Sequence, residues 1–283
     1  MKITRFIPKL TAAALGGLAA LAAGSLYYAT RIEPGWLRAT SLSLFLPRLH
    51  PNFDNYRIVH ISDIHLGTWI TRQRLEKIVR YINHLHADLV AITGDFVTDI
   101  YPNTPVDLME TLSALDVPDG VFAVLGNHDY WSDAGIIRQI LAASGVVELR
   151  NSVHTLRRGT GMLHITGIDN YWENKARLRE ILAQLPPQGA AILLAHEPDY
   201  AVVSAQSGRF DLQLSGHSHG GQFILPKIGP LVLPMYGRRY PSGLYQIENM
   251  QLYTNRGLGT AKQQFRFNCR PEITIITLHA PVV

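Results

Sequence analysis

The sequence predicts an α/β fold: a two-layer β-sandwich flanked by helices and preceded by one N-terminal hydrophobic helix. Between residues 57 and 143, short apolar runs alternate with stretches of helical periodicity. From residue 146 onward strand-type runs dominate, and near the N-terminus residues 10–30 carry no charged side chain. Strands that alternate with helices early and cluster late are typical of two strand layers around one core.

Composition narrows the class of protein. The chain has 283 residues, of which 47% are hydrophobic and 17% charged, and this balance argues against intrinsic disorder. The formal net charge is only +4 and no Lys/Arg run dominates, so we expect no nucleic-acid partner. Because Cys269 is the single cysteine, the chain cannot form an internal disulfide or a site of several thiolates. Any metal ion must therefore have nitrogen and oxygen ligands.

Residues 1–30 predict a membrane anchor or a signal segment. Lys2, Arg5 and Lys9 precede the uncharged residues 10–30, which as a helix would span about 31 Å. We expect a single uncleaved anchor in a bacterial inner membrane, on a side that the flanking charges do not decide. A cleaved signal peptide and an alanine-rich helix buried in the domain are the alternatives.

The other elements follow in chain order. Residues 31–56 contain three prolines and predict a linker with a short edge strand over 41–45. The expected domain covers 57–283, and its first half alternates strands 57–62, 88–93 and 121–125 with helices 71–86, 106–115 and 135–143. Its second half has one helix, near 175–185, and strands at 146–149, 153–157, 162–168, 190–195, 211–215, 242–248, 251–255 and 272–278.

Side chains of metal-ligand type follow five of the predicted strands. The five motifs are Asp63-Ile64-His65, Gly94-Asp95, Gly126-Asn127-His128-Asp129, His196-Glu197-Pro198 and Gly216-His217-Ser218-His219. One such motif is weak evidence, because an aspartate after a strand is more often a helix cap. Five in order are expected to converge at the carboxyl ends of the strands. Carboxylate, imidazole and amide ligands suit Zn, Mn and Fe, and there are enough for two ions that share a carboxylate.

The spacing within two motifs has a geometric interpretation. In an extended strand end, residues i and i+2 project to the same side, so Asp63 and His65, or His217 and His219, should reach one ion or two neighbouring ions. We also expect Asp169 and Asn170 to line the pocket.

Together the five motifs resemble the calcineurin-like metallophosphoesterase superfamily, whose ordered pattern is D-x-H, G-D, G-N-H-[DE], H and G-H-x-H. The strings SGHSHGGQ, NRGLGT and NCRPEITIITL are similar to a subgroup of small, membrane-anchored bacterial phosphoesterases. Some of its members are phosphodiesterases, and some hydrolyse the pyrophosphate of UDP-2,3-diacylglucosamine in lipid A synthesis. The resemblance implies the metallophosphoesterase fold and a metal-dependent phosphodiesterase or pyrophosphatase.

The resemblance also implies roles for individual residues. Two divalent ions (Mn, Zn or Fe) are expected, with Asp95 as the bridge: one with Asp63, His65, Asp95 and His219, the other with Asp95, Asn127, His196 and His217. His128 is expected over the substrate phosphate, and Asp129 is expected to orient it.

The expected substrate is a phosphate ester, and an anchored enzyme favours one linked to a lipid, such as UDP-2,3-diacylglucosamine. The apolar residues 223–236, close to His219, predict a lipid-facing wall or lid, although packing under a long loop explains them equally well. A generic phosphodiesterase or phosphatase acting on soluble substrates is the alternative. A non-catalytic metal-binding scaffold is disfavoured by the intact ligand set, and a metal-dependent amidohydrolase or peptidase by the lack of an H-E-x-x-H motif.

Overall fold

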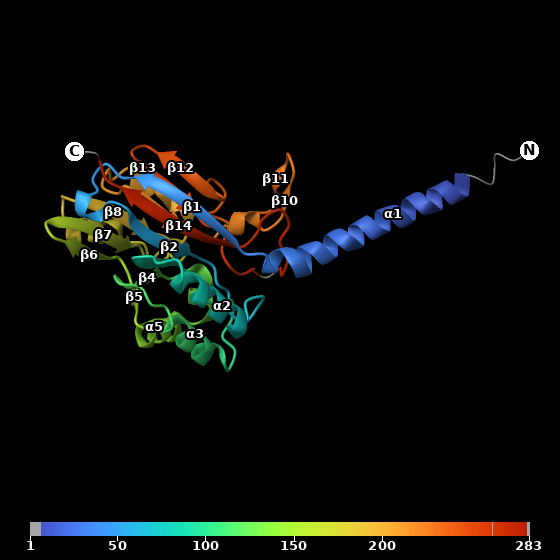
Figure 1. Cartoon of the computed structure of the whole chain (residues 1–283), viewed down its shortest axis with the longest axis horizontal. Coiled ribbons are helices and arrows are strands. Elements are labelled where there is room, and N and C mark those ends of the chain that lie inside the picture. The colour runs from blue at the N-terminus through green and yellow to red at the C-terminus, as the bar shows by residue number, and fades with distance from the viewer. Residues whose placement is uncertain (1–6, 262, 282–283) are drawn as a thin grey trace, which may run out of the picture.

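The computed structural model describes residues 7–261 and 263–281, with side chains described from residue 15 onward. Two six-stranded sheets form the body, and α1 (Ile7–Tyr27) extends from one end of it as a lone helix (Figure 1). The predicted two-layer arrangement flanked by helices is confirmed.

The first sheet has the strand order β1-β14-β2-β3-β4-β5. Its four parallel strands are β2 (Tyr56–Ile61), β3 (Leu89–Thr93), β4 (Val121–Val124) and β5 (Val146–Glu148). The helices between them are α2 (Arg72–Asn83), α3 (Thr104–Leu112), α4 (Asn127–Ser132) and α5 (Ala134–Ala143). β14 (Glu272–His279) runs antiparallel to β2. Since β3 and β4 are buried on both faces, their sequences are apolar apart from Thr93 at the end of β3.

The second sheet has the order β12-β13-β9-β8-β7-β6. In chain order its strands are β6 (Ser152–Arg158), β7 (Gly161–Gly167), β8 (Ala190–Leu194), β9 (Leu212–Ser215), β12 (Gly243–Ile247) and β13 (Met250–Thr254). β7, β8, β9 and β13 are parallel, and β6 and β12 close the two edges antiparallel. The short hairpin of β10 (Ile224–Leu225) and β11 (Gly229–Pro230) lies outside both sheets.

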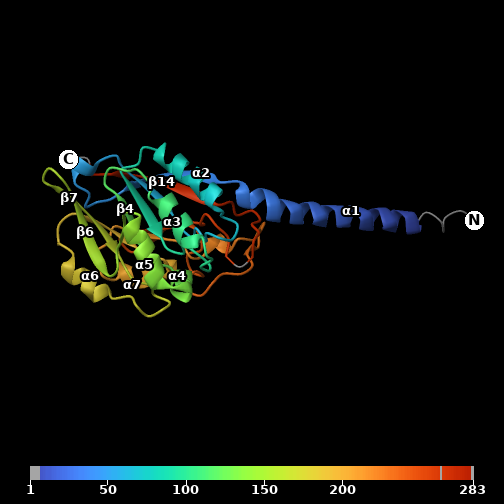
Figure 2. The same cartoon turned by 90° about the horizontal axis from the view of Figure 1, so that it is seen from below.

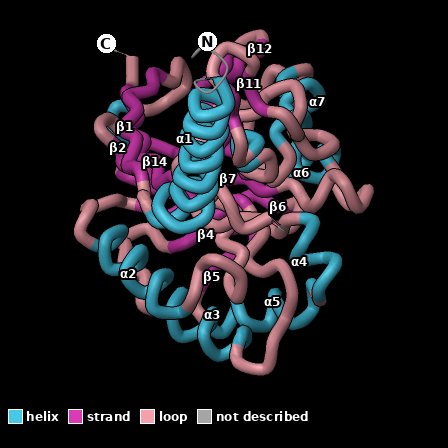
Figure 3. The backbone as a smooth tube through the Cα atoms, turned by 90° about the vertical axis from the view of Figure 1, so that its right-hand side faces the viewer, coloured by secondary structure: helices cyan, strands magenta, loops and turns pink. Residues whose placement is uncertain are grey.

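Three apolar layers hold the sheets and helices together. The inner faces of the two sheets share one core, in which Ile58 and Phe122 pack with Ile192 and Leu212. Helices α2, α3 and α5 cover the outer face of the first sheet, and α6 (Leu178–Gln184) and α7 (Ala201–Ala205) cover the outer face of the second (Figures 2 and 3). This layering leaves the carboxyl ends of the parallel strands free to present loops.

The segment expected to be a linker belongs to the domain. The predicted edge strand is confirmed as β1 (Arg38–Phe45), which begins three residues earlier than expected and pairs in parallel with β14. Leu46, Leu49 and Phe53 are buried in the core between the sheets, so the linker prediction is wrong for residues 38–53. Three prolines end regular structure locally, but they do not prevent the neighbouring apolar side chains from packing.

The N-terminal helix departs from two expectations. Residues 15–27 are exposed, so the alternative of a helix buried in the domain is wrong. Within residues 7–261 and 263–281, no helix combines the length and the hydropathy needed to cross a bilayer, and the expected spanning anchor is not supported there. The physical reason is composition, because almost half of α1 is alanine or glycine, whose transfer into hydrocarbon gains little. Lys2 and Arg5, counted in the sequence as part of the anchor signal, lie outside the described residues.

Candidate metal centre

The five motif loops meet at one end of the two sheets and form two groups of ligand-type side chains. Ligand atoms of Asp63, His65, Asp95 and His219 all lie within 4.8 Å of one another, and so do those of Asp95, His196 and His217. Asp95 belongs to both groups. Every one of these six side chains is buried, although each carries polar or charged atoms. Burying so many polar groups is costly unless they bind one another or an ion.

In the second group, His196 and His217 are each oriented by a hydrogen bond to a backbone carbonyl outside the centre. His196 donates its Nδ1 proton to the Thr93 carbonyl at 2.6 Å, and His217 donates its Nε2 proton to the Met235 carbonyl at 2.8 Å. His196 Nε2 faces His217 Nδ1 at 3.1 Å, Asn127 Oδ1 at 3.1 Å and Asp95 Oδ2 at 3.4 Å. With three acceptor atoms around this one nitrogen, a divalent cation can replace the proton that His196 Nε2 otherwise carries. Asn127 Oδ1 thus lies beside the second group, and its role as a metal ligand stays a prediction.

The first group shows the same convergence. His65 Nε2 lies 3.1 Å from His219 Nε2 and 3.6 Å from Asp95 Oδ2, while His219 Nε2 lies 3.3 Å from Asp63 Oδ1. The other nitrogen of His65 is hydrogen-bonded to Thr98 Oγ1 at 2.8 Å. That outer contact fixes the orientation of the imidazole, as is usual for metal-binding histidines.

Burial sets the protonation of these groups. It lowers the pKa of His65 and of His217 to about 3, so both rings are neutral at pH 7. It also raises the pKa of Asp63 to about 7, and the Asp95 charge adds to that rise against the opposing charge of His196. Burial acts in the same direction on Asp95, but the charge and hydrogen bond of His196 bring its pKa well below the usual range. For His196, burial lowers the pKa, but the charge and hydrogen bond of Asp95 raise it well above its usual range, so this ring must lose a proton when a cation binds. Imidazole and carboxylate ligands around a shared Asp95 are the donor set of divalent cations, so the residues present fit two such ions.

The backbone around the centre is strained in a way that the sequence did not indicate. Positive φ angles between 49° and 69° occur at five non-glycine residues of the ligand set, Asp63, His65, Asp95, His217 and His219. L-residues rarely adopt this left-handed region, and such strain concentrates at functional sites. The i, i+2 argument is therefore wrong in its premise, because the strands have ended before these residues. Asp63 and His65 still enter one group, whereas His217 and His219 enter different groups.

The glycines next to the ligands allow close approach of two loops. A Cβ at Gly126 would overlap the carboxylate of Asp95, and a Cβ at Gly216 would overlap that of Asp63. The glycines of the motifs are thus required by packing against the ligands.

His128 and Asp129 have different surroundings. The His128 ring lines the pocket and makes edge-to-face contacts with His65 and Trp131, with ring centroids 4.9 Å apart in each pair. Asp129 is fully buried, and its carboxylate accepts hydrogen bonds from the backbone amides of Asp95, Phe96, Val97 and Gly126. That Asp129 orients His128 stays a prediction. Its four hydrogen bonds fasten the Asp95 loop to the start of α4.

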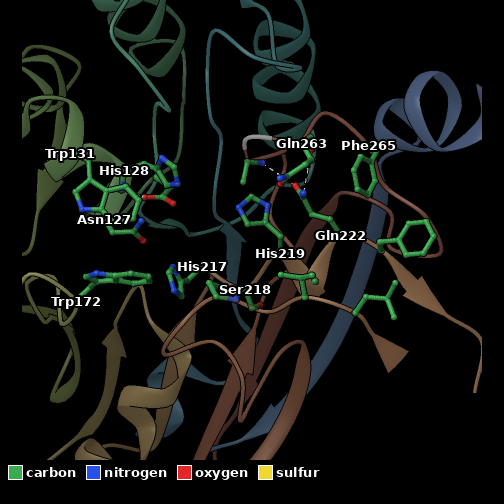
Figure 4. Close-up of a pocket in the computed structure, with 17 residues that line it drawn as sticks. Asn127, His128, Trp131, Trp172, His217, Ser218, His219, Gln222, Gln263 and Phe265 are labelled. Carbon is green, nitrogen blue, oxygen red and sulfur yellow. Dashed lines mark hydrogen bonds between the residues drawn. The ribbon is translucent and has the colours of Figure 1, made fainter. Parts of the chain in front are cut away.

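A cavity of about 530 Å³ opens beside the two groups and has two different ends. Figure 4 shows Trp131, His128 and Trp172 on one side, Phe265 on the other, and His217 and His219 between them. The two tryptophan rings are nearly perpendicular, at 88°, with centroids 5.4 Å apart. The opposite end is lined by Phe223, Leu231, Val232, Pro234 and Phe265. The loop over 223–236 thus contributes to the pocket wall, as one of its two interpretations predicted.

The sequence did not single out the tryptophans as pocket residues. Trp131 lies four residues after Asn127, and Trp172 follows Asp169 and Asn170, which we expected in the pocket wall. Asp169 instead binds Tyr130 and Arg150, and Asn170 accepts a hydrogen bond from the amide of Glu173, so both shape the turn that carries Trp172. A further contact comes from the buried Glu197, whose carboxylate accepts the amide protons of Tyr171 and Trp172. The sequence did offer one signal for Trp131 as a pocket residue, because this aromatic side chain follows closely after the ligand motif that contains Asn127.

The family model described as calcineurin-like phosphoesterase matches residues 56–221 of the chain. The protein belongs to this family. Together with the buried ligand cluster, membership makes it a metal-dependent phosphoesterase that uses divalent cations.

Three relatives span nearly the whole chain. The metallophosphoesterase YkuE of Bacillus subtilis is 34% identical over 273 residues, which cover 93% of this chain and 95% of YkuE. The UDP-2,3-diacylglucosamine pyrophosphatase LpxG of Chlamydia trachomatis is 29% identical over 308 residues, covering 88% and 91% of the two chains. The phosphodiesterase YaeI of Escherichia coli is 28% identical over 256 residues, covering 87% and 90%.

Proposed function

We propose that the protein hydrolyses a phosphodiester or pyrophosphate bond in an amphipathic, lipid-linked substrate, with UDP-2,3-diacylglucosamine as a representative. The observation that carries this proposal is the division of the pocket, which has ligand-type residues in the middle, two tryptophans at one end and aliphatic and phenylalanine side chains at the other. The name of the relative LpxG supports the same class of substrate.

The middle of the pocket is suited to phosphate. When bound, two divalent cations polarise phosphoryl oxygens and make a water molecule nucleophilic near neutral pH. Asp63, His65, Asp95 and His219 are proposed to hold one cation, and Asp95, Asn127, His196 and His217 the other. His128 is proposed to act from the pocket side, where its ring can donate a proton to a phosphoryl or leaving-group oxygen.

The position of His128 supports this role. Its backbone amide donates to Asp95 Oδ1 at 2.9 Å, which fixes the residue beside the bridging carboxylate, while its ring is directed into the pocket. The contacts with His65 and Trp131 limit the directions in which the ring can turn. A positioned donor of this kind stabilises charge that develops on the departing oxygen.

The two ends of the pocket suit the two halves of such a substrate. Flat aromatic faces bind a nucleobase by stacking, and Trp131 and Trp172 provide them beside His128 and His217. An acyl chain gains about 0.8 kcal/mol for each methylene that it buries, and the Phe223 and Phe265 end offers apolar contact for it. Because this substrate resides in a membrane, we propose the bacterial inner membrane as the place of action.

The alternative function is hydrolysis of a soluble phosphodiester, and the relative YaeI is named a phosphodiesterase. A soluble diester would use the centre and the tryptophans but not the apolar end. Binding at that end therefore distinguishes the two functions.

The test compares kcat/KM for UDP-2,3-diacylglucosamine in mixed micelles with that for the same sugar nucleotide without acyl chains. We expect at least a tenfold preference for the acylated substrate. The variant Phe265→Ala should lower that preference severalfold and leave activity on the deacylated nucleotide unchanged, whereas Trp131→Ala should weaken both substrates alike. Equal turnover of both substrates by the wild-type protein, with no effect of Phe265→Ala on their ratio, would overturn the proposal in favour of a soluble substrate.

A further inference from the structure

The β10–β11 hairpin and the loop that follows it carry an exposed group of apolar side chains with no role in the chemistry. Ile228 is 73% exposed, Leu231 55%, Val232 77% and Met235 45%. We call these four residues the apolar tip. We propose that the apolar tip docks on a lipid surface with anionic headgroups and places the apolar end of the pocket against that surface.

The apolar tip is continuous with the pocket wall. Leu231 and Val232 belong to both, since they line the cavity and are also open to solvent. Ile228 lies at the turn of the hairpin, where its amide donates to the Leu225 carbonyl, and Met235 follows four residues after Leu231. A lipid that moves from the lipid surface into the pocket would therefore contact apolar side chains along its whole path to the ligand-type residues.

The apolar tip lies at the same end of the body as α1. Phe267 connects the two, because its ring stacks on Phe223 at 5.1 Å and meets Tyr28, at the base of α1, edge-on at 6.2 Å. The Phe267 carbonyl also accepts the amide proton of Ile224 in the hairpin. Figure 1 shows the hairpin close to the base of α1.

The exposed residues of α1 are apolar as well. Leu15, Leu18, Leu21, Leu26 and Tyr27 are each more than half exposed. One end of the molecule thus presents two unpartnered apolar elements to solvent, which is unusual for a soluble protein unless the surface is an interaction site.

Charge favours a lipid surface over an apolar protein partner. The described segments 15–32 and 212–247 contain no aspartate or glutamate, while Arg31, Lys227, Arg238 and Arg239 within them are exposed cations. The adjacent Asp199 is occupied by the backbone amides of Arg238, Arg239 and Tyr240. Apolar side chains bordered by cations alone match the two layers of an anionic bilayer, hydrocarbon and headgroup, and each cation near such a surface adds attraction.

The docking proposal rests on the proposed function in one respect only, namely that a lipid-linked substrate enters the pocket from the docked side. Docking itself requires no substrate, and it is tested with full-length protein and vesicles. Cys269 is fully buried, so a cysteine introduced by Ile228→Cys can be labelled selectively with an environment-sensitive fluorophore. The matched control is Val147→Cys, at a side chain that is 43% exposed in β5, the edge strand of the first sheet farthest from β1.

With vesicles of phosphatidylglycerol and phosphatidylcholine, the label at position 228 should brighten severalfold and shift its emission to the blue. The label at 147 should not change, and vesicles of phosphatidylcholine alone should give a much smaller response at 228. Ile228→Asp should lower turnover of a vesicle-embedded phosphodiester severalfold without changing turnover of a soluble diester, and Val147→Asp should change neither.

Three results would overturn the docking proposal. Protein that sediments with vesicles while the label at 228 stays silent is bound through another element. A response at 228 that grows with protein concentration in the absence of lipid shows that a second copy covers the apolar tip. Equal responses at 228 and 147 show nonspecific adsorption. If the label at 228 responds but no lipid-linked substrate is hydrolysed, docking stands and the proposed function fails.

Discussion

The carboxylate of Asp129 makes four backbone hydrogen bonds that the family resemblance did not predict. One oxygen accepts the amide protons of Phe96 and Val97, at 2.8 and 3.3 Å, and the other accepts those of Asp95 and Gly126, each at 2.9 Å. An asparagine keeps one oxygen but places an NH₂ group before two amide donors, so Asp129→Asn loses two bonds. Asp129→Ala loses all four.

The expected cost follows from the number of bonds lost. At the lower end of the range for hydrogen bonds to a charged group, about 1.5 kcal/mol each, asparagine should cost about 3 kcal/mol of unfolding free energy and alanine about 6 kcal/mol. For a protein of this size, a loss of about 3 kcal/mol lowers the melting temperature by roughly 6–12 °C. Affinity for metal should also fall, because the same bonds fix the loop that carries Asp95.

The measurement is urea and thermal unfolding of chelated protein, with metal titration by calorimetry. Asp133→Asn is the matched control, since this exposed carboxylate caps α5 through the amides of Gly135 and Ile136 and asparagine caps a helix equally well. If Asp129→Asn keeps the wild-type stability and metal affinity but loses turnover, then Asp129 acts by orienting His128 and our structural assignment fails.

Four further results are expected. His128→Ala should keep both metal ions and the wild-type stability but lose most turnover, because its ring lines the pocket; loss of metal measured by elemental analysis would instead make it a ligand. Asp95→Asn should remove nearly all metal-dependent turnover, since Asp95 alone belongs to both ligand groups, and full metal content with full turnover would contradict that place. Chelation should abolish activity of the wild-type protein, and Mn or Zn should restore it; an active protein shown by elemental analysis to hold no metal would refute the site. Glu33→Ala should cost about 3 kcal/mol of stability in urea unfolding, because the buried carboxylate accepts the amides of Asn268 and Cys269, while unchanged unfolding would show that water replaces it.

The sequence by itself determined the elements and the kind of chemistry. Strand and helix periodicity is local, so β3, β4, β8 and α5 could be located from runs of a few residues. Ligand identity is also local, because a metal centre requires carboxylate and imidazole side chains in the loops that follow strands. The order of the five motifs carried the family assignment for the same reason.

Tertiary structure decided what depends on segments that are distant in the chain. β1 joins the sheet only through β14, which begins more than 220 residues later, so the local prolines favoured a linker that does not exist. Asp129 binds backbone amides of the Asp95 loop, which lie 32 to 34 residues earlier in the chain. An aspartate at position 129 does not by itself indicate which amides it will bind. The two ends of the pocket combine Trp131 with Phe265 and Leu231 from other loops. These side chains come together because the two sheets pack against each other. The periodicity within one segment carries no information about that packing.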